Sequence, residues 1–143
     1  MYHSTFNLKQ EAHDELQKYR SRHLLRKILH PFQKLELCSF NRAYNAYDSH
    51  NQVDSGLQLI PVENIVGSVS DNQNFDDQFN PRNAVSEKRW ISLYIGFVEG
   101  SAIPPIDVYK IGENYFVEDG HHRVSVARAI GQLMIEARVI SVQ

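Results

Sequence analysis

The chain has 143 residues, of which 42% are hydrophobic, and it carries 15 Lys/Arg against 17 Asp/Glu. Domains of this size hide roughly 68–70% of their unfolded surface, so we expect one compact domain with a real hydrophobic core, preceded by a shorter extension. The single cysteine excludes an internal disulfide and favours the cytoplasm, and no apolar run approaches the roughly 20 residues of a membrane span, so no membrane partner is expected.

The first predicted element is a long helix over Leu8–Leu29, with Asn7 as its N-cap and Gln10 as the capping-box partner. Pro31 ends it. At about 100° per residue the apolar side chains form two stripes on different sides of the helix, and the first stripe gives way to the second near Arg20. The stripes are Leu8, Ala12, Leu16 and Tyr19 on one side and Leu24, Leu25, Ile28 and Leu29 on another. Either the helix breaks between them or it packs against two surfaces, and we expect the second stripe to contact another chain, most simply in a homodimer.

Charge is unevenly divided along the chain. Residues 1–43 carry eight Lys/Arg against four Asp/Glu, and residues 44–143 carry seven against thirteen. A basic arm ahead of an acidic domain is one arrangement that contacts nucleic acid through its phosphates. On the predicted helix, however, the basic side chains scatter round the circumference and form no single stripe. A solvated helix is therefore the favoured interpretation, with nucleic-acid binding left open.

A second, shorter apolar segment covers residues 32–47, and the polar run 48–56 is typical of a linker. Helical extension and linker are thus expected to occupy residues 1–56, and the domain residues 57–143. Cys38, inside the extension, is expected to be a small buried residue. The histidines of the extension form no i, i+4 pair with a carboxylate, so no metal site is predicted.

The pattern in residues 57–143 predicts a small α+β domain with a mixed β-sheet and flanking helices. Its expected elements are a strand over 57–62, a polar loop over 67–83, a helix over 84–99, a hairpin of strands 106–111 and 115–117 around 112–114, and a last strand over 135–142. On the helix, an apolar stripe of Trp90, Leu93, Tyr94 and Phe97 is expected to face the core.

The polar loop is a candidate functional segment, because an irregular stretch of seventeen residues in a small domain is usually functional or mobile. Arg82 lies near its end and is placed to reach a bound phosphate. An exposed arginine beside Pro81 explains the same position equally well, and the sequence does not separate the two readings.

Residues 119–123, Asp-Gly-His-His-Arg, lie between a strand and a helical run and predict a phosphate-binding turn. A strand that turns into a helix at Gly120 exposes the first backbone N–H groups of the helix, which carry the positive end of its dipole. Arg123 offers a planar fork of donors, and His121 and His122 add donors whose charge is adjustable near neutral pH. Asp119 is the expected N-cap, and a capped turn with no ligand is the structural alternative.

The stretch 103–139 resembles the ParB/sulfiredoxin superfamily, in which a strand ends in a glycine motif that opens a helix. In that resemblance Gly120, His122 and Arg123 match the sulfiredoxin phrase Gly-Cys-His-Arg, which holds ATP, while ParB proteins hold CTP with Gly-Glu-Arg-Arg. His121 stands where sulfiredoxin has its catalytic cysteine, so sulfinate repair lacks its nucleophile. Phrases at 65–69, 75–82 and 119–128 look most like those of small bacterial members.

The resemblance implies a nucleoside di- or triphosphate as the ligand, of the ATP, CTP or ADP type, with or without Mg²⁺. A ligand-binding or regulatory module is the favoured function. The alternative is a small-molecule phosphotransferase or nucleotide hydrolase, similar to free-serine kinases, which needs a carboxylate base; Glu118, Asp119 and Glu99 are the candidates. A nuclease or DNA-associated partition protein comes third, because neither a metal-binding carboxylate cluster nor a basic surface is evident.

Overall fold

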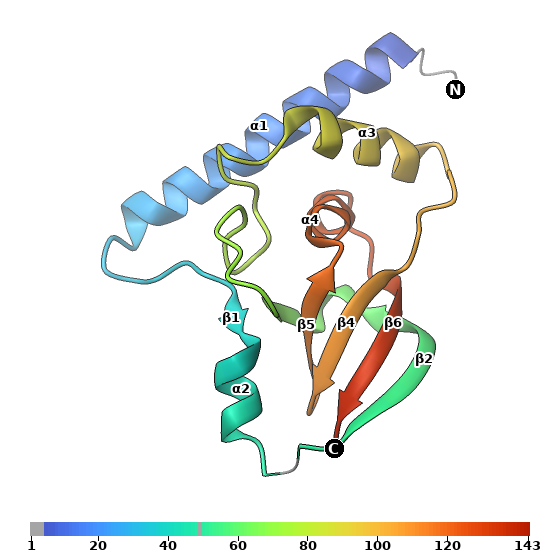
Figure 1. The fold of residues 1–143 in the computed structure, drawn as a ribbon. Helices are drawn as coiled ribbons and strands as arrows, with labels where there is room; N and C mark the ends of the chain where they lie inside the picture. The colour runs from blue at the N-terminus through green and yellow to red at the C-terminus, as the bar shows by residue number, and fades with distance from the viewer. Residues whose placement is uncertain (1–4, 49) are drawn as a thin grey trace.

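The computed structural model describes residues 5–48 and 50–143, and it confirms the predicted α+β class with a mixed sheet and flanking helices (Figure 1). Its elements are α1 (Thr5–Leu29), β1 (Cys38–Ser39), α2 (Phe40–Ala46), β2 (Gln52–Pro61), the 3₁₀ helix η1 (Val62–Asn64), β3 (Ile65–Ser68), α3 (Glu87–Val98), β4 (Ile106–Ile111), β5 (Asn114–Asp119), α4 (His121–Ala129) and β6 (Met134–Val142). None of the helices in the described ranges is long and apolar enough to cross a membrane.

The six strands form one sheet in the order β1-β3-β5-β4-β6-β2. The pairs β1–β3, β3–β5 and β4–β6 are parallel, whereas β4–β5 and β2–β6 are antiparallel. The expected hairpin and the expected last strand are both confirmed. Alternating side chains specify both elements locally, and a tight glycine turn also specifies the hairpin. β5 runs on to Asp119 and delivers the chain directly into α4.

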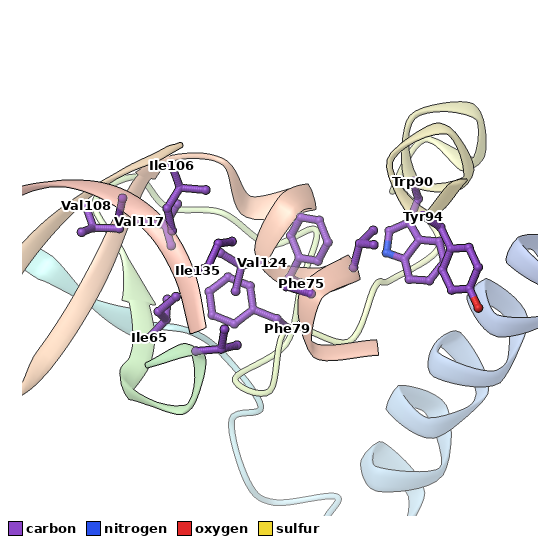
Figure 2. Close-up of a cluster of buried hydrophobic side chains, with 14 of the residues drawn as sticks. Ile65, Phe75, Phe79, Trp90, Tyr94, Ile106, Val108, Val117, Val124 and Ile135 are labelled. Atoms are coloured by element: carbon purple, nitrogen blue, oxygen red, sulfur yellow. The ribbon is translucent and has the colours of Figure 1, made fainter. Parts of the chain in front are cut away.

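One face of the sheet carries the main hydrophobic core. Ile106, Val108 and Val117 point from the central strands toward Val124 of α4, and Trp90 lies beyond them on α3 (Figure 2). Beyond α4 the helices follow one another, with α3 packing on α4 and α1 packing on α3. This layering confirms part of the apolar stripe expected on α3: Trp90 and Tyr94 are buried, while Leu93 and Phe97 are half-buried.

The opposite face of the sheet is covered over only part of its width. Phe40 of α2 packs on Phe116 and Tyr109, and Ile111 and Val142 complete this second cluster. Leu57 and Leu59 of β2 are among the side chains that stay exposed beyond α2.

α1 is one continuous helix, so the expected alternative of a break near Arg20 is wrong. Leu8, Ala12 and Leu16 are buried as predicted, and the inward face then continues with Arg20 and His23, which are also buried. The inward residues become polar because the second half of α1 lies against the polar loop before α3 instead of the apolar core.

The two ends of α1 were predicted with different success. Because the helix begins at Thr5, Asn7 lies within its first turn and is not the N-cap; the predicted end at Leu29 is confirmed.

The polar run expected as a linker is partly a strand. β2 begins at Gln52, pairs with Val142 at the end of β6, and contains a bulge between Asp54 and Gly56. Its polar residues are suitable for a strand at the edge of the sheet, where solvent reaches one side. The same residues would also be suitable for a linker, so the sequence pattern alone does not distinguish the two. The boundary expected after residue 56 therefore falls inside β2.

Residues ahead of that boundary also belong to the sheet. β1 pairs with β3 through Cys38 and Gly67, and it is the edge strand at the other side. Because this strand has only two residues and lies at the edge, Cys38 is exposed, which corrects the expected buried position.

The loop between β3 and α3 is folded around its own buried residues. Phe75 and Phe79 are buried in the main core, and Asp76 between them is fully buried as well. α3 begins at Glu87, three residues later than expected, because Ser86 accepts a hydrogen bond from the Arg89 N–H and caps the helix.

Candidate functional site

The turn between β5 and α4 has the geometry that an anion-binding helix start requires. Gly120 is the N-cap residue, at φ 117° and ψ 22°, a backbone conformation that favours glycine. The first intrahelical hydrogen bond runs from the Val124 N–H to the Gly120 carbonyl, so the N–H groups of residues 121–123 precede the helical ladder. Gly120 has no side chain to cap them. Asp119 was expected as the N-cap; its carboxylate instead accepts from Arg123.

This turn opens on a cavity of about 740 Å³. The N-terminal part of α3 forms a second wall, so the cavity faces the beginnings of two helices. Its lining residues are Asn72, Asn74, Ser86, Lys88, Arg89, Ser92, Leu93, Pro104, Asp119, Gly120, His121, His122 and Arg123. The uncapped start of α4, with side chains from the first turns of α3 opposite it, favours a negatively charged ligand.

The charges around the cavity point the same way. Lys88, Arg89 and Arg123 line it, against one carboxylate, that of Asp119. Asp119 and Arg123 form an ion pair at 3.1 Å. Among the described lining residues, Lys88 and Arg89 are exposed and make no hydrogen bond or ion pair through their side chains. Two unpaired cations therefore remain for a ligand.

Arg123 is less available than its place in the motif indicates. Its Nη1 donates to the carbonyl oxygens of Pro104 and Pro105 at 2.9 and 2.8 Å, and its Nη2 donates to Asp119. The guanidinium thus ties the entry of β4 to the start of α4. This holds one wall of the cavity in place and occupies several of the donors that a phosphate would use.

The two histidines of the motif have different surroundings. His121 is buried, its Nε2 lies 2.7 Å from the Ser68 hydroxyl, and its ring stacks on Phe75. Burial, with a smaller contribution from His122, lowers the pKa of His121 to about 4. His122 meets the Phe75 ring edge-on, and burial together with the charge of Arg89 lowers its pKa. Both rings are accordingly neutral at pH 7, and His121 serves as part of the floor of the cavity.

The buried neutral His121 predicts an acid-sensitive fold. An unfolded histidine takes up a proton near pH 6.5, so between pH 6.5 and about 4 the unfolded state binds more protons than the folded one. The free energy of unfolding falls as pH falls through this window, by on the order of 3 kcal/mol in full. We expect His121→Gln to flatten this slope in urea unfolding measured from pH 7 to pH 4.5. His30→Gln, a change at an exposed ring, is the matched control and leaves the slope as it is. If the free energy of unfolding of His121→Gln depends on pH as steeply as that of the parent, buried neutral His121 is not the cause of the acid sensitivity.

Three residues expected at the site lie elsewhere. Glu118 is on the opposite face of the sheet from Asp119, because neighbouring strand residues alternate, and it lines a separate groove. Arg82 donates from Nη2 to the Leu35 carbonyl at 2.7 Å and does not line the cavity. Glu99 is the C-cap of α3, at the opposite end of that helix from the cavity.

Asn72, Asn74, Lys88, Arg89 and Ser92 line the cavity but were not singled out in the sequence. A signal for two of them was present. Ser86 followed by Glu87 fits the start of a helix, and a start there places Lys88 and Arg89 in its first turn. Lys88 and Arg89 lie close to residues 119–123 only because α3 packs against α4. The local sequence pattern gives no information about this tertiary packing.

No family model matches the chain, and no curated protein matches it. Among solved structures it is similar to the crystal structure of sulfiredoxin from Arabidopsis thaliana, with 17% sequence identity and a TM-score of 0.42, over 58% of this chain and 82% of that one.

Proposed function

We propose that the cavity binds a phosphate-bearing small molecule of the nucleoside di- or triphosphate class. The observation that carries the proposal is the convergence of the uncapped start of α4 with the unpaired cations Lys88 and Arg89 on one cavity. Backbone N–H groups at a helix start and flexible cationic side chains together are a common way of binding phosphate oxygens.

The size of the cavity supports a ligand larger than inorganic phosphate. At about 740 Å³ it falls in the middle of the range of roughly 300–1,000 Å³ that small-molecule sites occupy. Besides its cations it offers the amides of Asn72 and Asn74, the hydroxyl of Ser92 and the apolar side chain of Leu93. These groups suit the uncharged part of a nucleotide, and Mg²⁺ bound to the phosphates would enter with the ligand.

Calorimetric titration with ATP, ADP and CTP, each with and without Mg²⁺, tests the proposal. We expect Arg89→Ala and Lys88→Ala each to weaken binding roughly ten- to a hundredfold, because hydrogen bonds to charged groups contribute about 1.5–3 kcal/mol and 1.4 kcal/mol corresponds to a factor of ten. These variants are sharper than Arg123→Ala, which also releases the wall held by Pro104 and Pro105. Lys34→Ala, an exposed lysine outside the cavity, is the control and is expected to bind like the parent.

Two results would contradict this function. One is the absence of any heat or melting shift with all three nucleotides at millimolar concentration. The other is binding that Arg89→Ala and Lys88→Ala leave unchanged, which would place the ligand outside this cavity.

A second candidate function, phosphoryl transfer, is favoured by the position of Asp119. It is the one carboxylate among the described residues that line the cavity, and a transferase needs a carboxylate to accept the proton of the attacking hydroxyl. Incubation with labelled nucleotide and a set of small hydroxyl compounds, serine included, tests it. If the site is catalytic, Asp119→Asn loses turnover and keeps nucleotide binding; a parent protein that binds nucleotide and transfers nothing is a binding module.

A further inference from the structure

The last two turns of α1 expose a continuous apolar surface. The fractional exposures are Leu24 48%, Leu25 56%, Ile28 74% and Leu29 64%, with Phe32 at 99% just after the helix. We call these five residues the α1 patch. His23 and Arg26 lie on the opposite side of the same turns and interact with Asp76 in the loop between β3 and α3. The α1 patch therefore faces away from its own domain. Figure 1 shows this half of α1 extending beyond α3.

The α1 patch lies in a strongly basic segment. Residues 18–34 contain six Lys/Arg and no acidic residue. Two of the six are directed inward, because Arg20 pairs with Glu87 and Arg26 with Asp76 and Asp77. Arg22, Lys27 and Lys34 are exposed in the same segment as the apolar side chains and give it positive charge.

A second exposed surface has the opposite charge. On the face of the sheet that carries α2, the part formed by β2, β6, β4 and the end of β5 stays uncovered. We call it the open sheet face; its residues are Asp54, Leu57, Leu59, Asp107, Glu118, Glu136 and Arg138. It includes a groove of about 340 Å³, and Leu57 and Leu59 are 58% and 68% exposed. Four carboxylates stand there against one arginine, which approaches Asp107 at 3.9 Å.

We propose that the α1 patch of one copy of this chain docks on the open sheet face of a second copy. Each surface joins exposed leucine or isoleucine side chains to unbalanced charge, and the two charges are opposite. A docked pair removes both apolar surfaces from water and matches basic residues with acidic ones. The two surfaces differ, so the proposed dimer places the two copies about a two-fold axis, which makes the contact twice, once in each direction, and closes the pair.

Other occupants leave part of the molecule unexplained. A helix with leucines among basic residues also suits an anionic lipid surface, but a membrane would not take up the acidic, apolar sheet face. Pairing of α1 with α1 brings two basic segments together and leaves Leu57 and Leu59 in water. The second copy accounts for both surfaces.

Charge reversal in the full-length chain tests the proposal by sedimentation velocity at tens of micromolar protein. The helix variant carries Arg22→Glu and Lys27→Glu, and the sheet variant carries Glu118→Lys and Glu136→Lys. We expect the parent to be dimeric and each variant alone to associate at least tenfold more weakly. An equimolar mixture of the two variants is expected to recover a one-to-one dimer, because both contacts are then again between opposite charges. Higher salt should weaken the parent dimer.

Thermal melting of each variant checks that it is folded. Lys9→Glu and Glu113→Lys, made separately at exposed sites outside both surfaces, are the controls for added negative and added positive charge. Three results would overturn the proposal: a monomeric parent, a sheet variant that dimerises like the parent, which indicates helix-to-helix pairing, and vesicles containing phosphatidylserine that bind the parent and dissociate its dimer. Nucleotide binding enters none of these measurements, so the outcome is separate from that of the proposed function.

Discussion

Replacing Asp76 by asparagine is expected to destabilise the protein by about 3 kcal/mol, at the lower end of the range for breaking a buried ion pair. Asp76 is fully buried, and its Oδ1 accepts from the backbone N–H groups of Gln78 and Asn80, both at 2.9 Å. Its Oδ2 receives His23 Nδ1 at 3.0 Å and Arg26 Nη1 at 2.8 Å. Asparagine keeps the shape but removes the charge and one acceptor from among these donors.

The pKa of Asp76 indicates which interactions prevail at this buried position. Burial by itself raises the pKa, but hydrogen bonds from Asn80, His23 and two backbone N–H groups outweigh it and lower the pKa below the usual value. The carboxylate is therefore ionised in the folded protein at neutral pH. It joins α1 to a loop more than fifty residues away in sequence, the same loop that supplies Asn72 and Asn74 to the cavity.

Urea unfolding at pH 7 measures the effect, and Asp77→Asn is the matched control. Asp77 also bonds to Arg26, but its side chain is 37% exposed, so we expect its loss to cost less than about 1 kcal/mol. Arg26 keeps one carboxylate partner in each variant, so the two variants differ in the burial of the carboxylate that is lost. Equal stabilities for the two variants would show that burial of Asp76 contributes nothing special to the attachment of α1.

The parts of the fold that were predicted from sequence are those that neighbouring residues specify. The hairpin around Gly112, the last strand (predicted over 135–142 and observed as β6) and the entry from β5 into α4 at Gly120 all follow from alternation and turn chemistry within about ten residues. In the same way the burial of Leu8, Ala12 and Leu16 followed from helical spacing.

Features that depend on distant partners were missed. Arg20 and His23 are buried because Glu87 at the start of α3 and Asp76 in the loop before it meet them, and nothing near them in sequence indicates this. Likewise Arg82 was expected either to reach a phosphate or to be exposed beside Pro81, and its Nη2 donates to the Leu35 carbonyl instead. At the candidate site the sequence located the turn at residues 119–123 but not the facing wall with Lys88 and Arg89, because that wall comes from packing between helices.

Substituting alanine for Gly120 is expected to destabilise the protein by about 2–6 kcal/mol. A Cβ atom at this position would lie 2.4 Å from Cγ2 and 2.9 Å from Cβ of Ile106, and Ile106 is fully buried with no room to retreat. Overpacking of this kind typically costs about 1–3 kcal/mol. The backbone at φ 117° adds strain of about 1–3 kcal/mol for a residue with a side chain.

Gly112→Ala separates the two contributions. Gly112 also has a positive φ, of 60°, but a Cβ there would meet nothing within 4 Å. We expect it to cost about 1–2 kcal/mol, the usual penalty of the left-handed conformation. The excess in Gly120→Ala then contains the contact with Ile106 and the extra strain of φ 117° over φ 60°. The double variant with Ile106→Ala isolates the contact, and it should cost less than the sum of the two single changes. Full additivity would mean that the turn moves away from β4 as a unit. In that case nucleotide binding should fall in Gly120→Ala at temperatures where the variant is still folded, since the N–H groups of residues 121–123 would no longer face Lys88 and Arg89.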